Sequence, residues 1–270
     1  MIIDAHCHIY PPKIAERAVE GIMTFYNLSE EQRPLPGTVD ELLRIGEENG
    51  VKHFLCHSVA TVPAQVRSIN EFIASSVNAN PGKITGFGTL HPDSEDLEGD
   101  IKHLKSLGLK GVKIHPDFQL FALDDDKGMK LGKLISDYDL PVLTHCGDLR
   151  YDRSNPKQLY NFVKAFPELR IIAAHLGGWS KWDEAVEILA GLPNLWFDSS
   201  SSFSNMSPSR GLQIVRTYGA DRIMFGTDYP MWHTDIELDN IKALGLTKEE
   251  EDLILYKTFV NFMGLEEFDD

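Results

Sequence analysis

The sequence predicts an α/β protein that folds as one (β/α)₈ TIM-barrel domain over residues 1–270. Three observations predict this fold: eight short β-branched segments alternate with amphipathic segments, the chain has 270 residues, and no linker or low-complexity tract divides it. A barrel of this kind takes about 250 residues. Strands that alternate with helices imply right-handed crossovers and a parallel sheet. An open doubly wound sheet is less compatible, because no glycine-rich phosphate loop follows the first strand.

The predicted elements follow one another in a regular order. The strands are expected at residues 2–8, 51–58, 84–90, 111–115, 141–145, 170–175, 194–198 and 222–226. The helices are expected at residues 39–48, 65–78, 97–107, 127–137, 157–166, 183–190 and 209–218. Thr38 and Ser207 are typical N-caps of the helices that they precede, and Gly50 is a typical C-cap.

Two segments exceed what eight strand–helix units require. Residues 11–37 form a long insertion after the first strand, and we expect them to lie over the mouth of the barrel, since such loops in compact domains are often functional. Residues 234–264 are expected to form two C-terminal helices that close the barrel.

The composition bears on the class of partner. The chain has 26 Lys and Arg against 41 Asp and Glu, a net charge of −15. This excess repels phosphate backbones and anionic membranes, so we expect a small-molecule substrate, no nucleic acid and no membrane. Three distant cysteines, no apolar run of about 18 residues and no signal-peptide pattern favour a cytoplasmic protein. The sequence is also compatible with a homodimer.

Polar side chains recur at or just beyond the predicted strand ends. They are His6, His8, His57, His91, Lys113, His115, His145, His175, Asp198 and Asp228. In a parallel barrel these ends converge on the face that carries active sites. His6 and His8 lie on the same side of one strand, about 6.6 Å apart along it, close enough to share a cation. Alone, this pair would fit polar surface pairing equally well, but His145 and Asp228 are placed to complete a metal site.

Four motifs resemble those of the amidohydrolase superfamily. They are DAHCH at residues 4–8, THCG at 144–147, AHLGG at 174–178 and FGTDYP at 225–230. The chain is similar, over essentially its whole length, to the "amidohydrolase 2" branch of metal-dependent TIM-barrel hydrolases and decarboxylases, which includes aminocarboxymuconate-semialdehyde decarboxylase. The order of the motifs is specific for the superfamily and much less specific for the reaction.

The resemblance implies one divalent metal ion per chain. Zn²⁺ is the metal that we favour, and Mn²⁺ and Fe²⁺ are alternatives. It implies four metal ligands, His6, His8, His145 and Asp228. Two residues would be catalytic: His175 would contact the water or the substrate as an acid or base, and Asp228 would accept the proton of the water in hydrolytic members.

Lys113 has two interpretations. Binuclear members of the superfamily carry a carboxylated lysine on this strand, and it bridges two metals. An uncarboxylated lysine that binds a substrate anion is the alternative that we favour, with His115 on the same face of the strand. We therefore expect a second metal only if Lys113 is carboxylated.

Other residues that follow strand ends are weaker candidates for substrate binding. They are His91, Arg150, Tyr10, Trp179 and Tyr229. Aromatic rings could form a pocket wall and the arginine could recognise an anion, but loop capping, packing and plain solvation remain open for them.

Side-chain alternation along the strands also predicts the directions of residues beside the expected ligands. Cys7 and Cys146 should point away from the site. His53 and His57 share a face of the second strand, but the sequence gives neither of them a set of metal-binding partners.

The favoured function is hydrolysis of an amide, ester or lactone of a small, carboxylate-bearing molecule by metal-activated water. The alternative is non-oxidative decarboxylation of a small unsaturated or aromatic acid. A non-catalytic metal-binding barrel is less favoured, because a storage site needs neither His175 nor an open coordination position. A phosphoesterase fits the motifs less well.

Overall fold

Short parallel strands form the centre of the computed structural model, which describes residues 1–29 and 34–265. Their bounds are β1 (Ile3–His8), β2 (His53–His57), β3 (Ile84–Gly86), β4 (Gly88–Thr89), β5 (Val112–Ile114), β6 (Val142–Thr144), β7 (Ile171–Ala173), β8 (Leu195–Asp198) and β9 (Ile223–Met224). They pair in the orders β1-β2-β3 and β4-β5-β6-β7-β8-β9, and every pair is parallel. The predicted third strand is therefore interrupted at Phe87, between β3 and β4.

Backbone hydrogen bonds bring the last strand beside the first. The amide of Ala5 donates to the carbonyl of Phe225 at 2.8 Å, and the amide of His8 donates to the carbonyl of Tyr229 at 2.7 Å. The parallel order of the strands and this junction are those of the predicted (β/α)₈ barrel.

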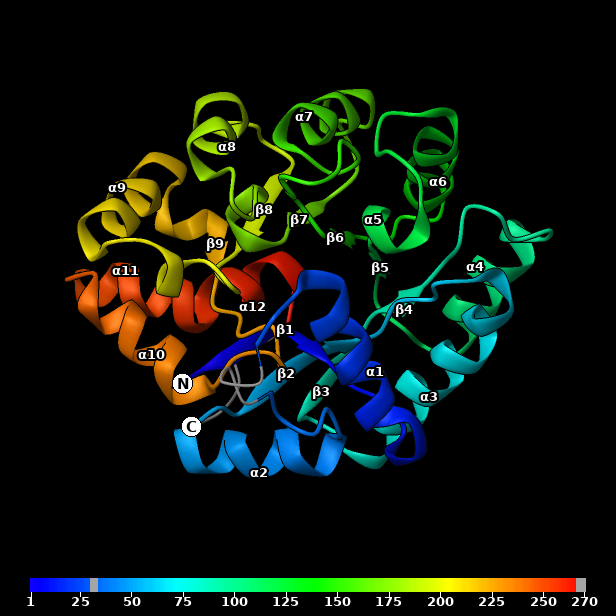
Figure 1. Cartoon of the computed structure of the whole chain (residues 1–270), viewed down its shortest axis with the longest axis horizontal. Coiled ribbons are helices and arrows are strands. Elements are labelled where there is room, and N and C mark those ends of the chain that lie inside the picture. Colours follow the sequence, from blue (N-terminus) through cyan, green and yellow to red (C-terminus); the bar gives the residue numbers. More distant parts are fainter. Residues whose placement is uncertain (30–33, 266–270) are drawn as a thin grey trace.

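Helices surround the strands (Figure 1). Seven of them agree with the predicted helices to within one residue at each end: α2 (Val39–Asn49), α3 (Val66–Ala79), α4 (Leu97–Ser106), α6 (Asp126–Asp137), α7 (Pro156–Ala165), α8 (Trp182–Leu189) and α9 (Pro208–Tyr218). Thr38 and Ser207 are N-caps whose side chains accept from the amides of Glu41 and Arg210. Gly50 ends α2 in the left-handed region, at φ 73°. Short 3₁₀ turns lie at Pro63–Gln65, His175–Gly177, Phe203–Asn205 and Ala220–Arg222.

The insertion after β1 contains a helix that the sequence patterns did not predict, α1 (Pro12–Tyr26). Pro12 occupies its first turn, where proline is well tolerated. Ala15 and Val19 are its buried residues, and Ile22 and Tyr26 line a cavity at the barrel mouth, as expected of this segment. Residues 30–33 of the insertion lie outside the described residues.

The C-terminal segment begins with α10 (Thr234–Ala243). A second helical run then joins α11 (Lys248–Asp252), a π-helical turn (Leu253–Lys257) and α12 (Thr258–Met263). This agrees with the expected two helices. A further short helix, α5 (Pro116–Gln119), follows β5 and was not predicted.

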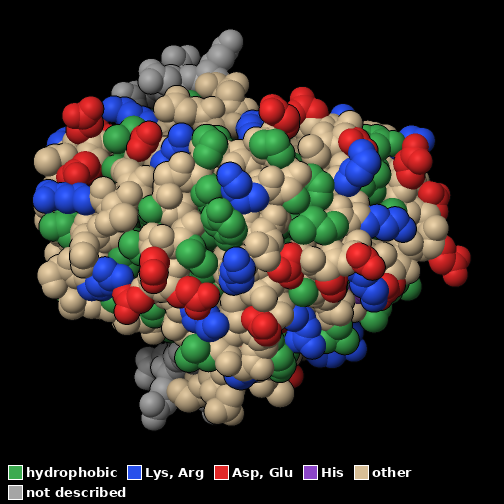
Figure 2. Space-filling model, turned by 90° about the horizontal axis from the view of Figure 1, so that it is seen from above, with side chains coloured by type: hydrophobic (Ala, Val, Ile, Leu, Met, Phe, Trp, Pro, Cys, Tyr) green, Lys and Arg blue, Asp and Glu red, His purple; other side chains and the backbone are tan. Residues whose placement is uncertain are grey.

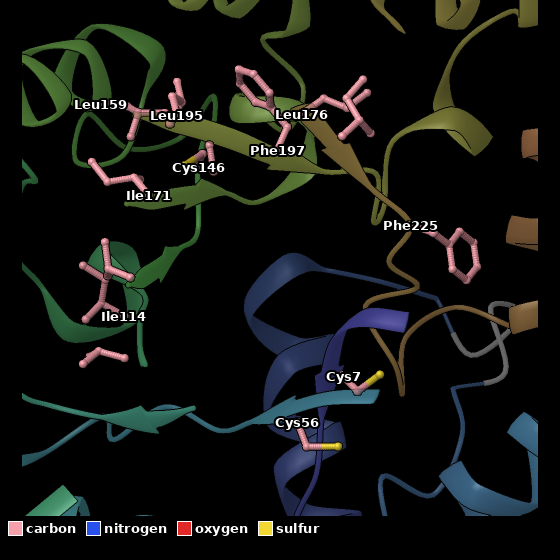
Figure 3. Packing of buried hydrophobic residues seen from close by; sticks show 14 of the residues in the cluster. Cys7, Cys56, Ile114, Cys146, Leu159, Ile171, Leu176, Leu195, Phe197 and Phe225 are labelled. Atoms are coloured by element: carbon pink, nitrogen blue, oxygen red, sulfur yellow. The ribbon is translucent and has the colours of Figure 1, made fainter. Parts of the chain in front are cut away.

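The core has two parts. Between the strands and their helices lies a large cluster that includes Cys7, Cys56 and Cys146 (Figure 3). Inside the barrel, Phe87 and Leu143 belong to a smaller cluster together with residues of α12, which closes that end. Cys7 and Cys146 are therefore packed outside the barrel, as alternation predicted, and all three cysteines are free and buried.

The surface carries both signs of charge. On the face shown in Figure 2, Lys and Arg side chains are interspersed with Asp and Glu. Among the helices of residues 1–29 and 34–265, none has the length and apolar character needed to cross a membrane.

Candidate active site

A cavity opens where the C-terminal ends of the strands converge, and it contains about 570 Å³ of empty space including its mouth. Its polar lining includes every predicted metal ligand and catalytic residue, together with Lys113 and His115. The predicted wall residue Trp179 also lines it. The structure thus brings together side chains from β1, β5 and the segments that follow β6, β7 and β9.

An irregularity in β1 aims the two histidines into this cavity. The ladder between β1 and β2 shifts register between Asp4 and Cys7. Ala5 packs inside the barrel, whereas Cys7 packs outside it. Such a bulge re-aims side chains, and both His6 and His8 consequently line the cavity.

His6, His8 and Asp228 form a compact donor set. Nε2 of His6 lies 3.2 Å from Nε2 of His8, and Oδ1 of Asp228 lies 3.4 Å and 3.5 Å from these two atoms. The carboxylate of Asp198 lies 2.8 Å from Nδ1 of His6, which leaves Nε2 to face the cavity. Imidazole nitrogens joined by a carboxylate oxygen are ligands that suit Zn²⁺, Mn²⁺ or Fe²⁺, so these residues fit a divalent metal.

The surroundings of His8 and Asp228 favour the protonation states in which these two side chains bind a metal. Burial lowers the pKa of His8 to about 4, so its imidazole is neutral. Burial acts to raise the pKa of Asp228, but the neighbouring His6 and His8 outweigh it and hold this pKa well below its usual value. The neutral imidazole of His8 and the ionised carboxylate of Asp228 are ready to coordinate without releasing protons.

His145 and His175 form a second layer of the cavity. Nε2 of His175 lies 3.1 Å from Nδ1 of His145. The ring of His175 also stacks on His6, with centroids 5.2 Å apart. Nε2 of His145 lies 3.0 Å from the carbonyl of Gly147. Nδ1 of His145 thus faces another imidazole nitrogen, as Nε2 of His6 does, and the role of His145 as a metal ligand stays a prediction. Among the described residues, His145 also groups with His115 and Asp117.

Lys113 is completely buried at the floor of the cavity. Its Nζ lies 3.2 Å from Nε2 of His6. Burial lowers the pKa of its ammonium group to about 8. This position suits a substrate anion, and it also suits a bridging ligand, so the two interpretations of Lys113 both remain compatible with the geometry.

Two residues that line the cavity, Tyr26 and Ser201, were not predicted from the sequence. Tyr26 of α1 places its hydroxyl 2.9 Å from Nε2 of His115 and 3.4 Å from Nε2 of His145. Ser201 donates to Oδ2 of Asp228 at 2.7 Å and accepts from Nε1 of Trp232 at 2.7 Å. The four-residue spacing of Ile22 and Tyr26 is the signal that could have placed both on one face of a helix.

The structure does not bring Arg150 or His91 into the cavity. Arg150 pairs with Asp148 at 2.7 Å and donates to the carbonyl of Phe25, so its charge ties α1 to the loop after β6. His91 accepts from the amide of Asp93 through Nδ1 at 3.2 Å. It therefore caps the loop that it begins.

Tyr10 and Tyr229 also lie outside this cavity. Tyr229 is fully buried, and its hydroxyl donates to the carbonyl of Thr38 at 2.8 Å, so it packs the barrel against α2. Tyr10 lines a neighbouring cavity between α1 and α3, which shares His8 with the first. The backbone beyond a strand end decides these directions, and strand alternation does not extend that far.

Residues 3–258 match the family model described as Amidohydrolase. The chain belongs to the amidohydrolase family. The comparison of this amidohydrolase with curated proteins found no match.

Solved structures resemble this amidohydrolase over nearly its whole length. An uncharacterised TIM-barrel protein, Bb4693 from Bordetella bronchiseptica, has a TM-score of 0.80 at 18% identity and covers 97% of this chain and 98% of its own. A dihydroxybenzoic acid decarboxylase from Polaromonas sp. JS666 with bound manganese has a TM-score of 0.73 at 17% identity, covering 97% and 96%. A putative 2-pyrone-4,6-dicarboxylic acid hydrolase from Pseudomonas putida has a TM-score of 0.68 at 19% identity, covering 99% and 98%. At these identities they establish the shared barrel fold.

Proposed function

We propose that this amidohydrolase is a metal-dependent hydrolase that opens an amide, ester or lactone of a small, flat molecule carrying a carboxylate. The observation that carries the proposal is the position of Asp228, whose Oδ1 lies within 3.5 Å of both histidine nitrogens of β1. A divalent ion bound there would polarise a substrate oxygen and lower the pKa of water toward about 7.

The chain itself supplies groups that move the proton. Oδ2 of Asp228 accepts a hydrogen bond from the hydroxyl of Ser201, which orients the carboxylate that would accept a proton from water. Nδ1 of His175 lies 3.1 Å from the carbonyl of Ser200, which orients the opposite nitrogen toward the cavity side of the ring. A carboxylate and an imidazole in reach of one reacting centre can pass a proton from the water to the leaving group.

The walls favour a flat, unsaturated substrate. Tyr26, Phe118, Trp179 and Trp232 line the cavity together with aliphatic side chains. Aromatic walls with a few convergent polar groups are typical of small-molecule sites. Lys113 is the one Lys or Arg among the described residues that line the cavity, and it would pair with the substrate carboxylate.

Decarboxylation is the second candidate, and the buried ammonium of Lys113 favours it. A substrate carboxylate held by Lys113 would lie beside His6, at the floor of the cavity. His175 or Asp228 would then return a proton to the carbon atom that loses CO₂. The name of the manganese-containing neighbour from Polaromonas is consistent with this chemistry.

Activity screening of metal-reconstituted protein tests the proposal. Chelator-treated chain would be loaded in turn with Zn²⁺, Mn²⁺ and Fe²⁺ and offered carboxylate-bearing lactones, amides and esters, and aromatic acids in parallel. Hydrolysis without CO₂ release supports the proposal. Stoichiometric CO₂ would support decarboxylation instead, and full activity of the metal-free chain would contradict metal dependence.

A further inference from the structure

A second cavity adjoins the candidate active site, and the proposed chemistry does not use it. It lies between α1 and α3, which are neighbours on one side of the barrel (Figure 1), and it contains about 1450 Å³ of empty space including its mouth. We call this cavity the α1–α3 groove. His8, Ile22 and Phe118 line both the groove and the active-site cavity. The groove therefore begins beside an expected metal ligand.

The walls of the groove are mainly apolar. Two of its large apolar side chains are exposed, Ile14 at 40% and Leu120 at 69%. Contiguous apolar surface that remains exposed is typical of a binding site. The apolar walls come from α1, α3 and the end of α5, and they include Ile14, Ala18, Phe25, Ile69, Phe72 and Leu120.

Polar side chains in the walls are already bonded to the protein. The hydroxyl of Ser58 donates to the carbonyl of Ile9, and the hydroxyl of Ser68 donates to the carbonyl of Gln65 at 3.1 Å. Oε1 of Gln65 accepts from the amide and from the hydroxyl of Thr61. A polar ligand would find few groups here to replace its hydrogen bonds with water, so its transfer into the groove would cost free energy.

The charged residues of the lining do not change this character. Asp117 is buried and accepts from the hydroxyl of Ser154 at 2.8 Å. Arg17 is exposed on α1, where a long side chain covers apolar surface while its charge stays in water. Lys113 and Asp228, in contrast, line the active-site cavity. The site thus divides into a polar part at the strand ends and an apolar part between α1 and α3.

We propose that the α1–α3 groove binds an apolar arm of the substrate, an alkyl chain or an aryl ring, while the carboxylate and the scissile bond stay in the active-site cavity. This inference rests on the proposed function. It narrows the substrate class to amides, esters or lactones that carry such an arm. Continuity with the active-site cavity through His8, Ile22 and Phe118 favours the substrate over a second copy of the chain as the occupant.

Straight-chain hydroxamates, from acetohydroxamate to octanohydroxamate, test the inference, because their common head group binds a metal ion and only the length of the arm changes. The affinity of the Zn²⁺-loaded chain for each would be measured by calorimetric titration. Each buried CH₂ should raise the affinity about fourfold, so octanohydroxamate should bind at least about 100-fold more tightly than acetohydroxamate. An affinity that does not depend on the length of the arm would overturn the inference.

Gly21→Trp fills the groove from the side of α1. Gly21 is one of the lining residues, and among the described residues a Cβ added there meets no atom within 4 Å outside its own stretch of helix. The melting temperature should be retained or rise, since glycine is unfavourable inside a helix. The affinity ratio of octanohydroxamate to acetohydroxamate should fall below about 10, because fewer CH₂ groups are buried. The wild-type ratio in this variant would overturn the inference.

Thr24→Trp is the matched control. Thr24 is exposed on the same helix and lines neither the groove nor the active-site cavity. This variant should keep the wild-type ratio of affinities. Sedimentation of the wild type and of Gly21→Trp tests the other occupant: a wild-type dimer that Gly21→Trp dissociates would assign the groove to a second copy and overturn the inference.

A crystal structure of the wild-type chain with Zn²⁺ and octanohydroxamate decides independently of the variants. Alkyl carbons between α1 and α3 support the inference, and an arm that leaves the active-site cavity elsewhere overturns it.

These outcomes separate the inference from the proposed function. A wild-type chain that binds acetohydroxamate through its metal, and hydrolyses substrates equally well with and without an apolar arm, would retain the function and overturn only the inference. A wild-type chain that binds no divalent ion would overturn the proposed function, and the inference with it, before any hydroxamate is added.

Discussion

The carboxylate of Asp198 lies 2.8 Å from Nδ1 of His6, and both side chains are completely buried. This contact selects the tautomer of His6 that carries its proton on Nδ1, so that Nε2 is free to bind a metal. The carboxylate of Asp198 also accepts from the amides of His175 and Ser200. One residue at the end of β8 therefore orients an expected metal ligand from β1.

Asp198→Asn should weaken metal binding without removing a ligand. An amide at this position can donate to Nδ1 of His6 and so favour the tautomer whose Nε2 carries the proton. We expect the affinity for Zn²⁺ to fall by about 10–100-fold, as for other residues that orient metal-binding histidines. Chelator competition measures this change, and an unchanged affinity would show that Asp198 does not set the tautomer.

Asp228→Asn should abolish most turnover while the fold is retained, because the change removes a proton acceptor and no core volume. Loss of a general base costs about 10²–10⁴-fold in rate. The rate constant kcat of metal-saturated variant and wild type would be compared, with circular dichroism as the check on folding. Undiminished activity of the folded variant would refute the role of Asp228.

The metal content of the chain distinguishes the two interpretations of Lys113. We expect one divalent ion per chain, because the ammonium of Lys113 lies 3.2 Å from His6 and is placed to bind an anion. Elemental analysis of metal-saturated protein measures the ratio. Two ions per chain in the wild type, reduced in Lys113→Met, would instead indicate a carboxylated lysine that bridges them.

Glu237 of α10 should make stability depend on pH. Burial raises the pKa of its carboxyl from 4.5 to about 7, against hydrogen bonds from Ser204 and Asn240. The folded chain therefore keeps a proton that the unfolded chain has lost, and stability falls as pH rises from about 4.5 to about 7. Relative to Glu237→Gln, the wild type should lose about 2.5 kcal/mol of unfolding free energy between pH 5 and pH 8.

Denaturant unfolding of wild type and Glu237→Gln at the two pH values measures this loss. Glu98→Gln is a suitable control, because that carboxylate is exposed on α4. The same difference in unfolding free energy at pH 5 and pH 8 would contradict the raised pKa of Glu237.

Local signals in the sequence were sufficient for most elements. Caps such as Thr38 and Ser207 act within one helical turn, so the helix bounds could be predicted to within one residue. The break at Phe87 and the helix α1 carry weaker local signals. The helix α1 depends on tertiary contacts, since its residues Ala15 and Val19 are buried and its Tyr26 contacts His115.

Strand alternation and the four sequence motifs were sufficient to predict the polar lining of the site, including His145, His175 and Asp228 beyond the strand ends. The ends of β1 and β5 could be located because residues two positions apart at a strand end, His6 with His8 and Lys113 with His115, are expected on the same face. The directions of the Tyr229 and Arg150 side chains could not be predicted, because both residues lie on loops. The environment of His57 could not be predicted either, since its neighbours belong to another strand and a register shift in β1 decides where they point.

Calorimetric titration of the apoprotein with Zn²⁺ tests most directly whether His6, His8 and Asp228 hold a metal. The wild-type chain should bind one ion with saturable heat, and the double variant His6→Ala/His8→Ala should bind none at the same concentrations while remaining folded. Equal binding by the folded double variant, or no binding by the wild type, would contradict the account.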